Sequence, residues 1–208
     1  MLATFTDLGK EVSCLSDPAQ SHSPATRNRK TIRSASSPSP TINGTGNGLD
    51  NTLTGNTAGN ALDGGSGNDV LKGNAGSDAL LGGVGNDKLI GGDGNDLLVG
   101  GTGDDIAAGG AGSDVFAFRS GFGTDRVVDF GTDDFIDLRG FGFASGQGVV
   151  NSFVQVGTNV VLALASGDQL TLQGVHKADL DASHFIVNDA GTASVPADVQ
   201  DLMHQYLV

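Results

Sequence analysis

A nine-residue cycle of apolar and polar positions organises the middle of this 208-residue chain. From residue 46 to residue 117, eight nonapeptides follow one another without a gap, and each begins with glycine. Their eighth position is apolar throughout: Leu53, Leu62, Leu71, Leu80, Leu89, Leu98, Ala107 and Phe116. Because nine residues are too few for a unit with its own core, each nonapeptide can bury its apolar side chain only by stacking on its neighbours. The pattern therefore predicts a solenoid.

The two halves of each nonapeptide predict different backbone. From residue 64 onward, six copies approach GGxGxDxUx, where U is apolar. The glycine half suits a turn with positive φ, and the last three residues are predicted to form a strand whose middle side chain points inward. Two copies then make one coil of 18 residues. Eight copies give four coils and two parallel sheets, three residues wide, that face each other across a leucine layer.

The pattern changes at both ends of the repeats. After residue 117, alternating apolar runs predict strands at 125–130, 134–138, 151–156, 159–164, 168–173 and 183–187. Behind Pro196, apolar residues at helical spacing predict an amphipathic helix. Residues 1–42 hold four of the five prolines, eight serines and a basic patch at 27–33. We expect a disordered leader at 1–42, a β-roll at 43–117, a β-rich cap at 118–188 and a tail at 189–208.

Composition narrows the chemistry of this chain. Of its 24 acidic residues, all but Glu11 are aspartate, a short carboxylate typical of turns and metal loops. The net charge of −13 argues against nucleic acid or an anionic membrane surface as a partner and favours a cation. Cys14 is the only cysteine, which excludes an internal disulfide and zinc or haem spacing. The sequence shows neither a membrane span nor a Sec-type signal.

The sixth position of the repeat carries the candidate chemistry: Asn51, Asn60, Asp69, Asp78, Asp87, Asp96, Asp105 and Asp114. Two-copy coiling stacks these side chains in two columns, with neighbours roughly 5 Å apart at the strand spacing. Each unscreened carboxylate pair would repel by about 3 kcal/mol at an effective dielectric near 20. A hard divalent cation between successive turns removes this cost.

Backbone carbonyls of the glycine turns and two aspartates offer a six-oxygen shell that suits Ca²⁺. Counting turns with glycine at position four and aspartate at position six, the pairs are 64 with 82, 82 with 100, 73 with 91 and 91 with 109. The sequence therefore predicts about four Ca²⁺ ions. Because Asn51 and Asn60 lack the charge, the first coil is expected to act as a cap that binds calcium weakly or not at all.

GGSGNDVLK, GGVGNDKLI, GGDGNDLLV and GGAGSDVFA resemble the repeat-in-toxin (RTX) motif, a calcium-binding β-helix repeat. Residues 118–188, with GFGTDRVVDFGTDDFIDL and NVVLALASGDQLTLQGV, resemble the C-terminal cap of serralysin-type secreted proteins. The resemblance implies an all-β, right-handed parallel β-roll that folds on calcium outside the cell. It also implies export by a type I secretion apparatus that reads an uncleaved C-terminal signal. The tail at 189–208 is either that signal or a plain surface helix.

The resemblance also implies a ligand set. In the family pattern, an upstream turn supplies the carbonyls of positions two and four and its aspartate, and the downstream turn supplies those of positions one and three and its aspartate. Gly65, Gly67 and Asp69 would thus face Gly82, Val84 and Asp87. The full implied set is Gly64, Gly65, Gly67, Asp69, Gly73, Asn74, Gly76, Asp78, Gly82, Gly83, Val84, Gly85, Asp87, Gly91, Gly92, Asp93, Gly94, Asp96, Gly100, Gly101, Thr102, Gly103, Asp105, Gly109, Ala111 and Asp114.

Two departures from the repeat lead to specific expectations. Asn74 replaces the second glycine of its copy, which costs little if its carbonyl is the ligand. Ala107 replaces the core leucine and leaves a local void, which Ile106 would fill after a small shift. Beyond the repeats, Asp133 and Asp134 lie near Asp129 and Asp137 and form either one more calcium site or simple turn carboxylates.

Other interpretations of the glycine tract fit less well. Low-complexity disorder does not explain an unbroken phase with leucine at one position, and no GKS or GKT follows to make a phosphate-binding loop. We find no catalytic motif: the four histidines are scattered, and the proximity of Asp181, Ser183 and His184 in sequence does not define a triad. The chain is therefore not expected to be an enzyme.

Two functional hypotheses remain. In the first, the chain is a stand-alone secreted calcium-binding protein. In the second, it is the C-terminal calcium-binding and secretion module of a larger RTX enzyme, such as a protease, lipase or epimerase. The genomic sequence immediately upstream would distinguish them, because an in-frame catalytic domain contradicts the first hypothesis.

Overall fold

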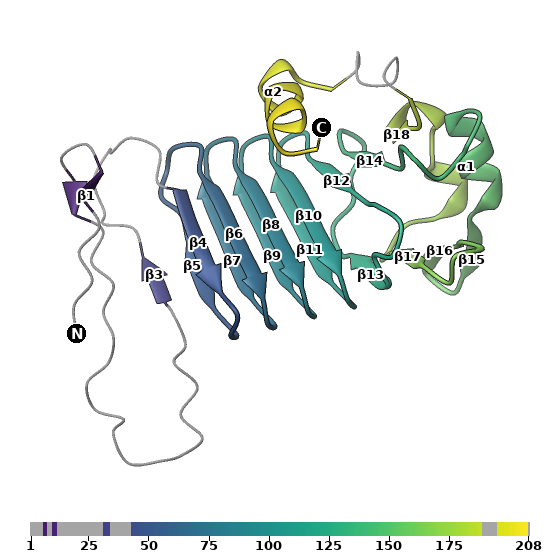
Figure 1. The fold of residues 1–208 in the computed structure, drawn as a ribbon. Helices are drawn as coiled ribbons and strands as arrows, with labels where there is room; N and C mark the ends of the chain where they lie inside the picture. The colour runs from purple at the N-terminus through teal and green to yellow at the C-terminus, as the bar shows by residue number, and fades with distance from the viewer. Residues whose placement is uncertain (1–5, 8–9, 12–30, 34–42, 189–194, 208) are drawn as a thin grey trace.

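Two sheets face each other and form a parallel β-solenoid (Figure 1). The computed structural model describes residues 6–7, 10–11, 31–33, 43–188 and 195–207. One sheet has seven strands, in the spatial order β18 (Phe185–Ile186), β14 (Phe135–Asp137), β12 (Val115–Ala117), β10 (Leu97–Thr102), β8 (Ala79–Val84), β6 (Ala61–Ser66) and β4 (Asn43–Asn47). All neighbouring strands of this sheet are parallel.

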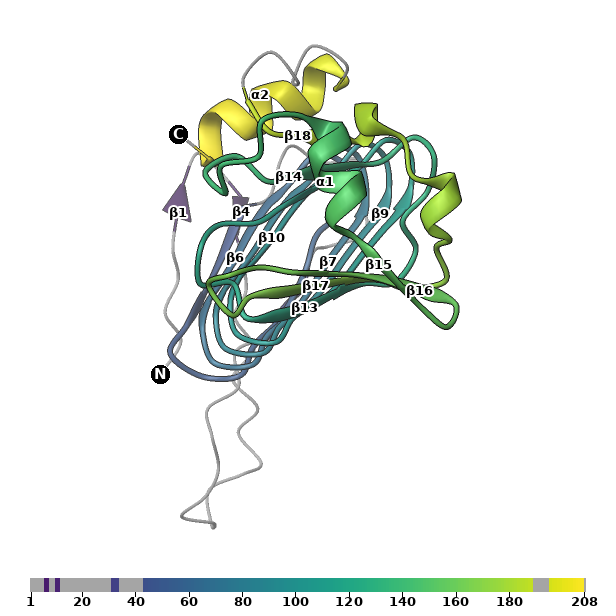
Figure 2. The ribbon, with the colours of Figure 1, turned by 90° about the vertical axis from the view of Figure 1, so that its right-hand side faces the viewer.

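The second sheet has nine strands. Their spatial order is β15 (Val154–Val156), β16 (Asn159–Ala163), β17 (Gln169–Leu172), β13 (Thr124–Val127), β11 (Ile106–Ala111), β9 (Lys88–Asp93), β7 (Val70–Ala75), β5 (Thr52–Thr54) and β3 (Thr31–Arg33). Pairing is parallel from β3 to β17, and β15 and β16 continue the sheet in antiparallel pairing. Viewed along the stack, the two sheets form the sides of a flattened coil (Figure 2).

Strand register confirms the predicted coil of two nonapeptides. Leu80 pairs with Leu62 on one side and Leu98 on the other, and each step is 18 residues. In the other sheet, Leu71 pairs in the same way with Leu53 and Leu89. These six leucines are at most 2% exposed and form the continuous apolar layer between the sheets. Repeat phase thus sets the register of the whole roll.

Two expectations about the strands were wrong. The strands from β6 to β11 are six residues long rather than three, because pairing continues into the first three positions of the next copy. The predicted shift of Ile106 is also absent: Ala107 stays in register with Leu89, and Ile106 remains at the outward-facing position paired with Lys88. Ala107 packs against the buried core, and the predicted void remains as a small cavity of about 10 Å³ that Phe116, Phe118 and Val127 help to line.

Parallel pairing continues past residue 117 into the cap. Each alternating run predicted there as a strand forms one, from β13 to β18. The sequence did not predict α1 (Gly146–Ser152), which Ser145 caps by accepting a hydrogen bond from the Gly148 N–H and which buries Val149 and Val150. Two short 3₁₀ helices, η1 (Lys177–Asp179) and η2 (Ala182–His184), complete this region.

The predicted terminal helix is α2 (Ala197–Tyr206), which lies beside the seven-stranded sheet (Figures 1 and 2). Its buried side chains pack on outward-facing residues of β10 and β12. Within the described residues, no helix is both long and apolar enough to cross a membrane.

Most of the predicted leader lies outside the described residues. Of residues 1–42, the structure describes a short antiparallel pair, β1 (Thr6–Asp7) and β2 (Lys10–Glu11), and the edge strand β3. β3 covers the end of the basic patch and pairs with β5. The predicted disorder of the leader and the division of the chain at residues 42, 117 and 188 stay predictions.

Candidate metal centre

Two columns of buried aspartates line the two edges of the roll. One column contains Asp69, Asp87 and Asp105, and the other contains Asp78, Asp96 and Asp114. Each of the six is at most 3% exposed, although the chain holds 24 acidic residues and could have placed them in solvent. Carboxylates are rarely buried without a compensating partner, so these columns mark a site that requires one.

A regular hydrogen bond fixes one oxygen of every carboxylate. The Asp69 N–H donates to Asp87 Oδ1 over 2.7 Å, and the Asp87 N–H donates to Asp105 Oδ1 over 2.7 Å. In the second column, the corresponding bonds join Asp78 to Asp96 over 2.8 Å and Asp96 to Asp114 over 2.9 Å. Each aspartate is thus held by the coil before it, and its side chain has one orientation.

The second oxygen of each carboxylate has no hydrogen-bond partner within the described residues. This holds for Oδ2 of Asp69, Asp78, Asp87, Asp96, Asp105 and Asp114, all of which are buried. A buried carboxylate oxygen without a partner costs about 1–3 kcal/mol or more. Six such atoms in register are not an accident of packing, and they identify where a cation belongs.

The glycine at position one shows which oxygens face these unpartnered atoms. A Cβ added to Gly82 would overlap both Asp87 Oδ2 and the carbonyl oxygen of Gly100 in the next coil. The two oxygens therefore border the same small space. The same pair of oxygens, from the copy's own aspartate and from the position-one carbonyl one coil on, meets at Gly64, Gly73, Gly82 and Gly91.

Backbone conformation also brings the turns of successive coils together. Positions two and four have positive φ, for example +110° at Gly83 and +128° at Gly85. Glycine is favoured at Gly83 and Gly85 on two grounds, because an added Cβ would also overlap the carbonyl of the preceding coil. At position two of one copy, Asn74 adopts φ +84°, and its Nδ2 donates to the Gly55 carbonyl over 2.8 Å.

Burial shifts the proton affinity of the columns. Desolvation raises the pKa of Asp78, Asp87, Asp96 and Asp114 to about 7, and the backbone hydrogen bond to each carboxylate offsets this only in part. Neighbouring carboxylates of the same column add to the rise at Asp87. Without a cation, the folded roll therefore holds a substantial share of these carboxylates protonated at neutral pH.

The donor set fits a hard cation bound largely by main-chain oxygen. The described residues bring together no group of three or more His, Cys, Asp or Glu side chains, so side chains alone do not make a shell. Carboxylate and carbonyl oxygens are the ligands that Ca²⁺ prefers, in shells of six to eight. The position-three carbonyl of Val84 accepts the Gly67 N–H over 2.9 Å, and its second lone pair stays available.

The first coil satisfies itself without a cation. The Asn60 Nδ2 donates to Asn56 Oδ1 over 3.0 Å, and the Asn56 N–H donates back to Asn60 Oδ1 over 2.7 Å. Asn51 makes the equivalent bonds, with its Nδ2 donating to Asn47 Oδ1 and to the Leu49 carbonyl. Beside Gly55, the atom that borders the Gly73 carbonyl is Asn60 Oδ1, which already accepts the Asn56 N–H. Both polar atoms of this amide therefore have partners within the turn, whereas each aspartate of the later copies keeps one oxygen without a partner in the described residues.

Two further aspartates extend the columns: Asp125, which was not predicted from the sequence, and Asp134, which was named only as part of a possible calcium site in the cap. The Asp105 N–H donates to Asp125 Oδ1 over 2.9 Å, and the Asp114 N–H donates to Asp134 Oδ1 over 3.0 Å. Burial raises the pKa of Asp125 to about 8. The sequence did hold a signal for Asp125, because GFGTDRV at 121–127 repeats the GxGxDxU spacing after a two-residue insertion.

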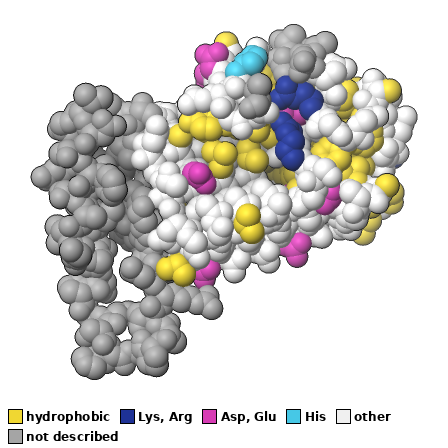
Figure 3. Space-filling model, viewed as in Figure 1, with side chains coloured by type: hydrophobic (Ala, Val, Ile, Leu, Met, Phe, Trp, Pro, Cys, Tyr) yellow, Lys and Arg dark blue, Asp and Glu magenta, His cyan; other side chains and the backbone are white. Residues whose placement is uncertain are grey.

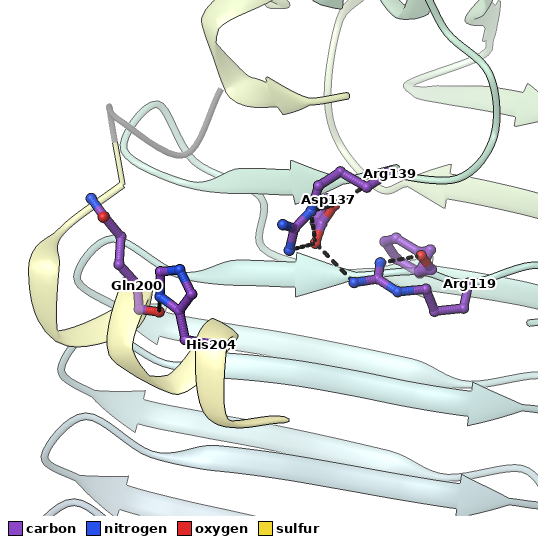
Figure 4. A network of polar contacts seen from close by, with 6 residues as sticks. Arg119, Asp137, Arg139, Gln200 and His204 are labelled. Atoms are coloured by element: carbon purple, nitrogen blue, oxygen red, sulfur yellow. Dashed lines mark hydrogen bonds and ion pairs between the residues drawn. The ribbon is translucent and has the colours of Figure 1, made fainter. Parts of the chain in front are cut away.

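The other acidic residues of the cap do not join in one site. Asp129 accepts the N–H groups of Gly109 and Gly110 over 3.0 and 3.1 Å. Asp137, which is fully buried, pairs with Arg119 over 3.1 Å and Arg139 over 3.0 Å (Figure 4). Lys and Arg side chains gather around an acidic one in a single place on the face drawn in Figure 3. The cluster is a structural ion pair between strands.

Catalytic geometry is missing from the residues that lie together in sequence. Asp181 caps η2 by accepting both the N–H and the Oγ–H of Ser183, and both residues are exposed. His184 Nε2 lies 3.1 Å from the Thr132 carbonyl rather than against the serine. These contacts hold a local turn and bring no base to a nucleophile.

Fold and site together define a parallel β-solenoid with buried, unpartnered carboxylate oxygens between its coils. Comparison with known families agrees: the model of the RTX calcium-binding nonapeptide repeat (4 copies) matches residues 45–80, 54–89, 81–116 and 90–127. The repeat region of this chain belongs to that family, and the RTX repeats imply Ca²⁺ binding. The match ends at residue 127, so the likeness of the cap to serralysin-type caps stays a prediction.

Two curated relatives are endo-1,3-1,4-beta-glycanases of Rhizobium meliloti (strain 1021). EglC is 37% identical over 70 residues, which cover 34% of this chain and 15% of the relative. ExsH is 33% identical over 63 residues, which cover 30% of this chain and 14% of the relative. The match thus spans about one seventh of these enzymes.

Two solved structures are also similar. The AlgE6R3 subunit of the Azotobacter vinelandii mannuronan C5-epimerase is 32% identical, with a TM-score of 0.47, 72% of this chain covered and 83% of that one. The extracellular lipase LipA from Serratia marcescens is 17% identical, with a TM-score of 0.41, 78% of this chain covered and 43% of that one.

Proposed function

We propose that this chain is a secreted calcium-binding β-roll whose repeats fold when Ca²⁺ binds. The observation that carries the proposal is the set of six buried, unpartnered Asp Oδ2 atoms. At four of these turns, the oxygen faces a carbonyl of the next coil, at Gly64, Gly73, Gly82 and Gly91. These are the four turn pairs that the repeat phase predicts, which supports a count of about four ions.

Each ion would be held by residues of two successive coils. The Asp87 carboxylate and the Gly83 and Gly85 carbonyls of one turn would face the Gly100 and Thr102 carbonyls and Asp105 of the next. Ca²⁺ supplies the positive charge that lets both carboxylates ionise in a buried place. The chain itself supplies the order, since the backbone N–H of each aspartate fixes the carboxylate that follows it.

Folding and binding are then one event. The metal-free roll places its carboxylates in a column and orders many glycines, so it has little to offset the loss of chain entropy. An affinity of roughly 10⁻⁴ to 10⁻³ M, as in extracellular modules, would keep the chain unfolded at cytosolic calcium and fold it outside the cell. Export through a type I apparatus belongs to this proposal, with residues 189–208 as the candidate signal.

Circular dichroism with calorimetry tests the proposal on the full chain. In EDTA we expect a spectrum with little β-structure, and titration with CaCl₂ should produce a cooperative gain in β-structure with about four ions bound. MgCl₂ at the same concentration should produce a much smaller gain, because Mg²⁺ requires a tighter octahedral shell. A spectrum equally β-rich in EDTA and in calcium would contradict the proposal.

A second candidate function is a calcium-binding module of a larger enzyme. It is favoured by the two glycanase relatives, in which the repeat match covers 15% and 14% of the protein. In that case the roll would fold beside a catalytic domain encoded in the same reading frame. Sequencing the genomic region upstream of the chain tests this: an in-frame catalytic domain supports the module, and an upstream stop codon contradicts it.

A further inference from the structure

Helix α2 covers one outer face of the roll and not the other. Its Val199 and Met203 side chains are at most 3% exposed, and they pack in a cluster with Leu97 and Val115 of the seven-stranded sheet. Tyr206 packs on the same cluster and is half-buried. Figure 1 shows the helix lying along one edge of the solenoid, over the coils. The docking of α2 therefore depends on the relative positions of several coils.

The first turn of this helix contacts two metal-site turns. Asp198 accepts a hydrogen bond from Ser77 Oγ over 2.6 Å and another from Asn95 Nδ2 over 3.1 Å. Ser77 and Asn95 hold the fifth position of turns 73–78 and 91–96, immediately before Asp78 and Asp96. One carboxylate of α2 thus joins the two turns that would share one calcium ion.

The opposite edge of the roll shows what this contact replaces. There the fifth positions link successive coils directly: the Asn68 N–H donates to Asp50 Oδ1, the Asn86 N–H to Asn68 Oδ1, and the Asp104 N–H to Asn86 Oδ1, over 2.8–3.0 Å. On the α2 edge, the Ser113 N–H donates to Asn95 Oδ1 over 2.8 Å in the same way, but the short Ser77 side chain turns to Asp198. The helix therefore supplies the side-chain link between turns 73–78 and 91–96 that the fifth positions do not make there.

Asp198 also brings negative charge to the site. Burial raises the pKa of Asp198, but the hydrogen bonds from Ser77 and Asn95 lower it further, so that the net shift is downward and the group is charged at neutral pH. Its charge contributes to the raised pKa of Asp96. A cation between turns 73–78 and 91–96 would be attracted by this third carboxylate from outside its ligand shell.

We propose that Asp198 is a positioning residue for the calcium ion bound between turns 73–78 and 91–96, and that calcium binding there and docking of α2 strengthen each other. The inference rests on the proposed function, since it requires calcium between those turns. Reciprocity follows from linkage: if calcium favours the spacing at which Asp198 reaches both Ser77 and Asn95, the docked helix favours calcium by the same factor.

Tyr206 provides a reporter of docking that needs no label. It is the only tyrosine of a chain without tryptophan, so tyrosine emission comes from α2 alone. In EDTA we expect Tyr206 to be fully accessible to acrylamide quenching, and calcium should protect it as the helix docks. Equal quenching in EDTA and in saturating calcium would overturn the coupling.

Asp198→Asn is the informative variant, and Asp201→Asn is its matched control. Asp201 lies on the same helix, is exposed and loses the same charge when it is changed to asparagine. We expect Asp198→Asn to raise the calcium concentration at half-folding about two- to fivefold, as for a solvent-exposed charged contact. Asp201→Asn should leave this concentration unchanged, and equal shifts in the two variants would overturn the proposal.

A double-variant cycle separates positioning from general stability. Asp96→Asn damages the column that α2 contacts, and Asp87→Asn damages the other column. The effect of Asp198→Asn should disappear in the Asp96→Asn background and persist in the Asp87→Asn background, because only the first pair shares a site. Additive effects in both backgrounds would assign Asp198 a merely structural role and contradict the proposal.

The proposed function and this inference fail in different ways. If the wild-type chain gains no β-structure with calcium, the proposed function is wrong. If the wild-type chain folds with calcium while Asp198→Asn behaves like Asp201→Asn, the calcium-binding roll stands and only the role of Asp198 is wrong.

Discussion

The first coil, with Asn51 and Asn60, and the later coils, with aspartate at the sixth position, differ in how they satisfy the buried polar side chain of the turn. We call them the asparagine coil and the aspartate coils. They share the register and the buried sixth-position side chain, but position two has positive φ in the later copies and not at Asn47 or Asn56. In the first coil, the Nδ2 groups of Asn51 and Asn60 satisfy neighbouring oxygens, so the turn is complete within the chain. In the later coils, the carboxylate has no N–H to donate, and its Oδ2, which lies where the asparagine Oδ1 lies, has no partner within the described residues. Replacing the amide by a carboxylate thus turns a self-sufficient turn into a candidate cation site.

The position of an aspartate within its column should decide how much its loss costs. Asp87 borders two predicted ions and Asp69 only one, while each accepts one backbone N–H over 2.6–2.7 Å. Asp87→Ala should lower the folding equilibrium constant at a fixed calcium concentration about a hundredfold and Asp69→Ala about tenfold, if each ion lost costs roughly 1.4 kcal/mol. Calcium titrations followed by circular dichroism measure both, and equal shifts would refute the two stacked columns.

Within the turns, position one should tolerate much less bulk than position three. Gly82→Ala places a Cβ against Asp87 Oδ2 and the Gly100 carbonyl, at a residue whose φ is not positive, so space alone is tested. We expect the calcium-saturated protein to lose roughly 1–3 kcal/mol of unfolding free energy, as for overpacking.

Gly48→Ala in the asparagine coil is the control for this substitution. Nothing lies within 4 Å of a Cβ added at Gly48, so its effect should stay within about 0.5 kcal/mol. Urea unfolding of both variants in calcium measures the difference. Similar losses in the two variants would show that the space beside Gly82 is not reserved for the ligand oxygens.

Much of this comparison was predictable because the repeat has an exact phase. A fixed spacing of nine residues places Leu62, Leu80 and Leu98 in one layer and every second aspartate in one column, without any knowledge of tertiary contacts. Features outside the phase were missed. The two-residue insertion before GFGTDRV hid Asp125 from the column count. Gly146 and the β-branched Val149 and Val150 are weak helix formers, and α1 depends on the Ser145 cap and on burial.

Contacts between segments far apart in the chain could not be predicted from the sequence pattern either. Amphipathic spacing predicted α2, but it carried no information on which face of the roll the helix would cover. The bond from Ser77 to Asp198 joins residues 121 positions apart. The ion pairs of Asp137 with two arginines likewise depend on the packing of β12 against β14. Local periodicity specifies the solenoid, while the cap and tail are specified by tertiary burial.

A third prediction converts an aspartate turn into an asparagine turn. The first coil carries asparagine at positions two and six, as in Asn47 and Asn51. The double variant Gly65→Asn with Asp69→Asn supplies the same two amides. Residue 65 can keep its φ of +94°, which asparagine tolerates as Asn74 does at +84°, or change to the non-positive φ of Asn47. We expect calorimetry to find one ion fewer, with the circular dichroism spectrum in calcium unchanged.

The single variant Asp69→Asn is the control for this conversion. It removes the charge without supplying the position-two partner, so it should lose the same ion and also require more calcium to fold. If the double variant folds no better than the single one, the pair of asparagines is not what completes the first coil.

The smallest expected effect is a difference in pH response. In the metal-free roll, burial raises the pKa of Asp78 and Asp96 to about 7, above the ordinary value near 3.9. A raised folded-state pKa contributes stability that is complete below the unfolded value and is lost as the pH rises through about 7. In EDTA, the β-structure of the wild type should therefore increase as the pH falls from about 8 to about 5. In limiting calcium the trend reverses, because protons compete with Ca²⁺ for the same carboxylates.

The asparagine turn has no group that titrates in this range, so the Gly65→Asn, Asp69→Asn variant should respond less to pH than the wild type. Both slopes come from circular dichroism in EDTA across the same pH range. A steeper slope in the variant would mean that the protons are taken up elsewhere in the chain. A shallower slope in the variant would assign part of the pH response to Asp69, whose pKa burial also raises. The proton would then bind the same carboxylate whose unpartnered oxygen is proposed to bind calcium.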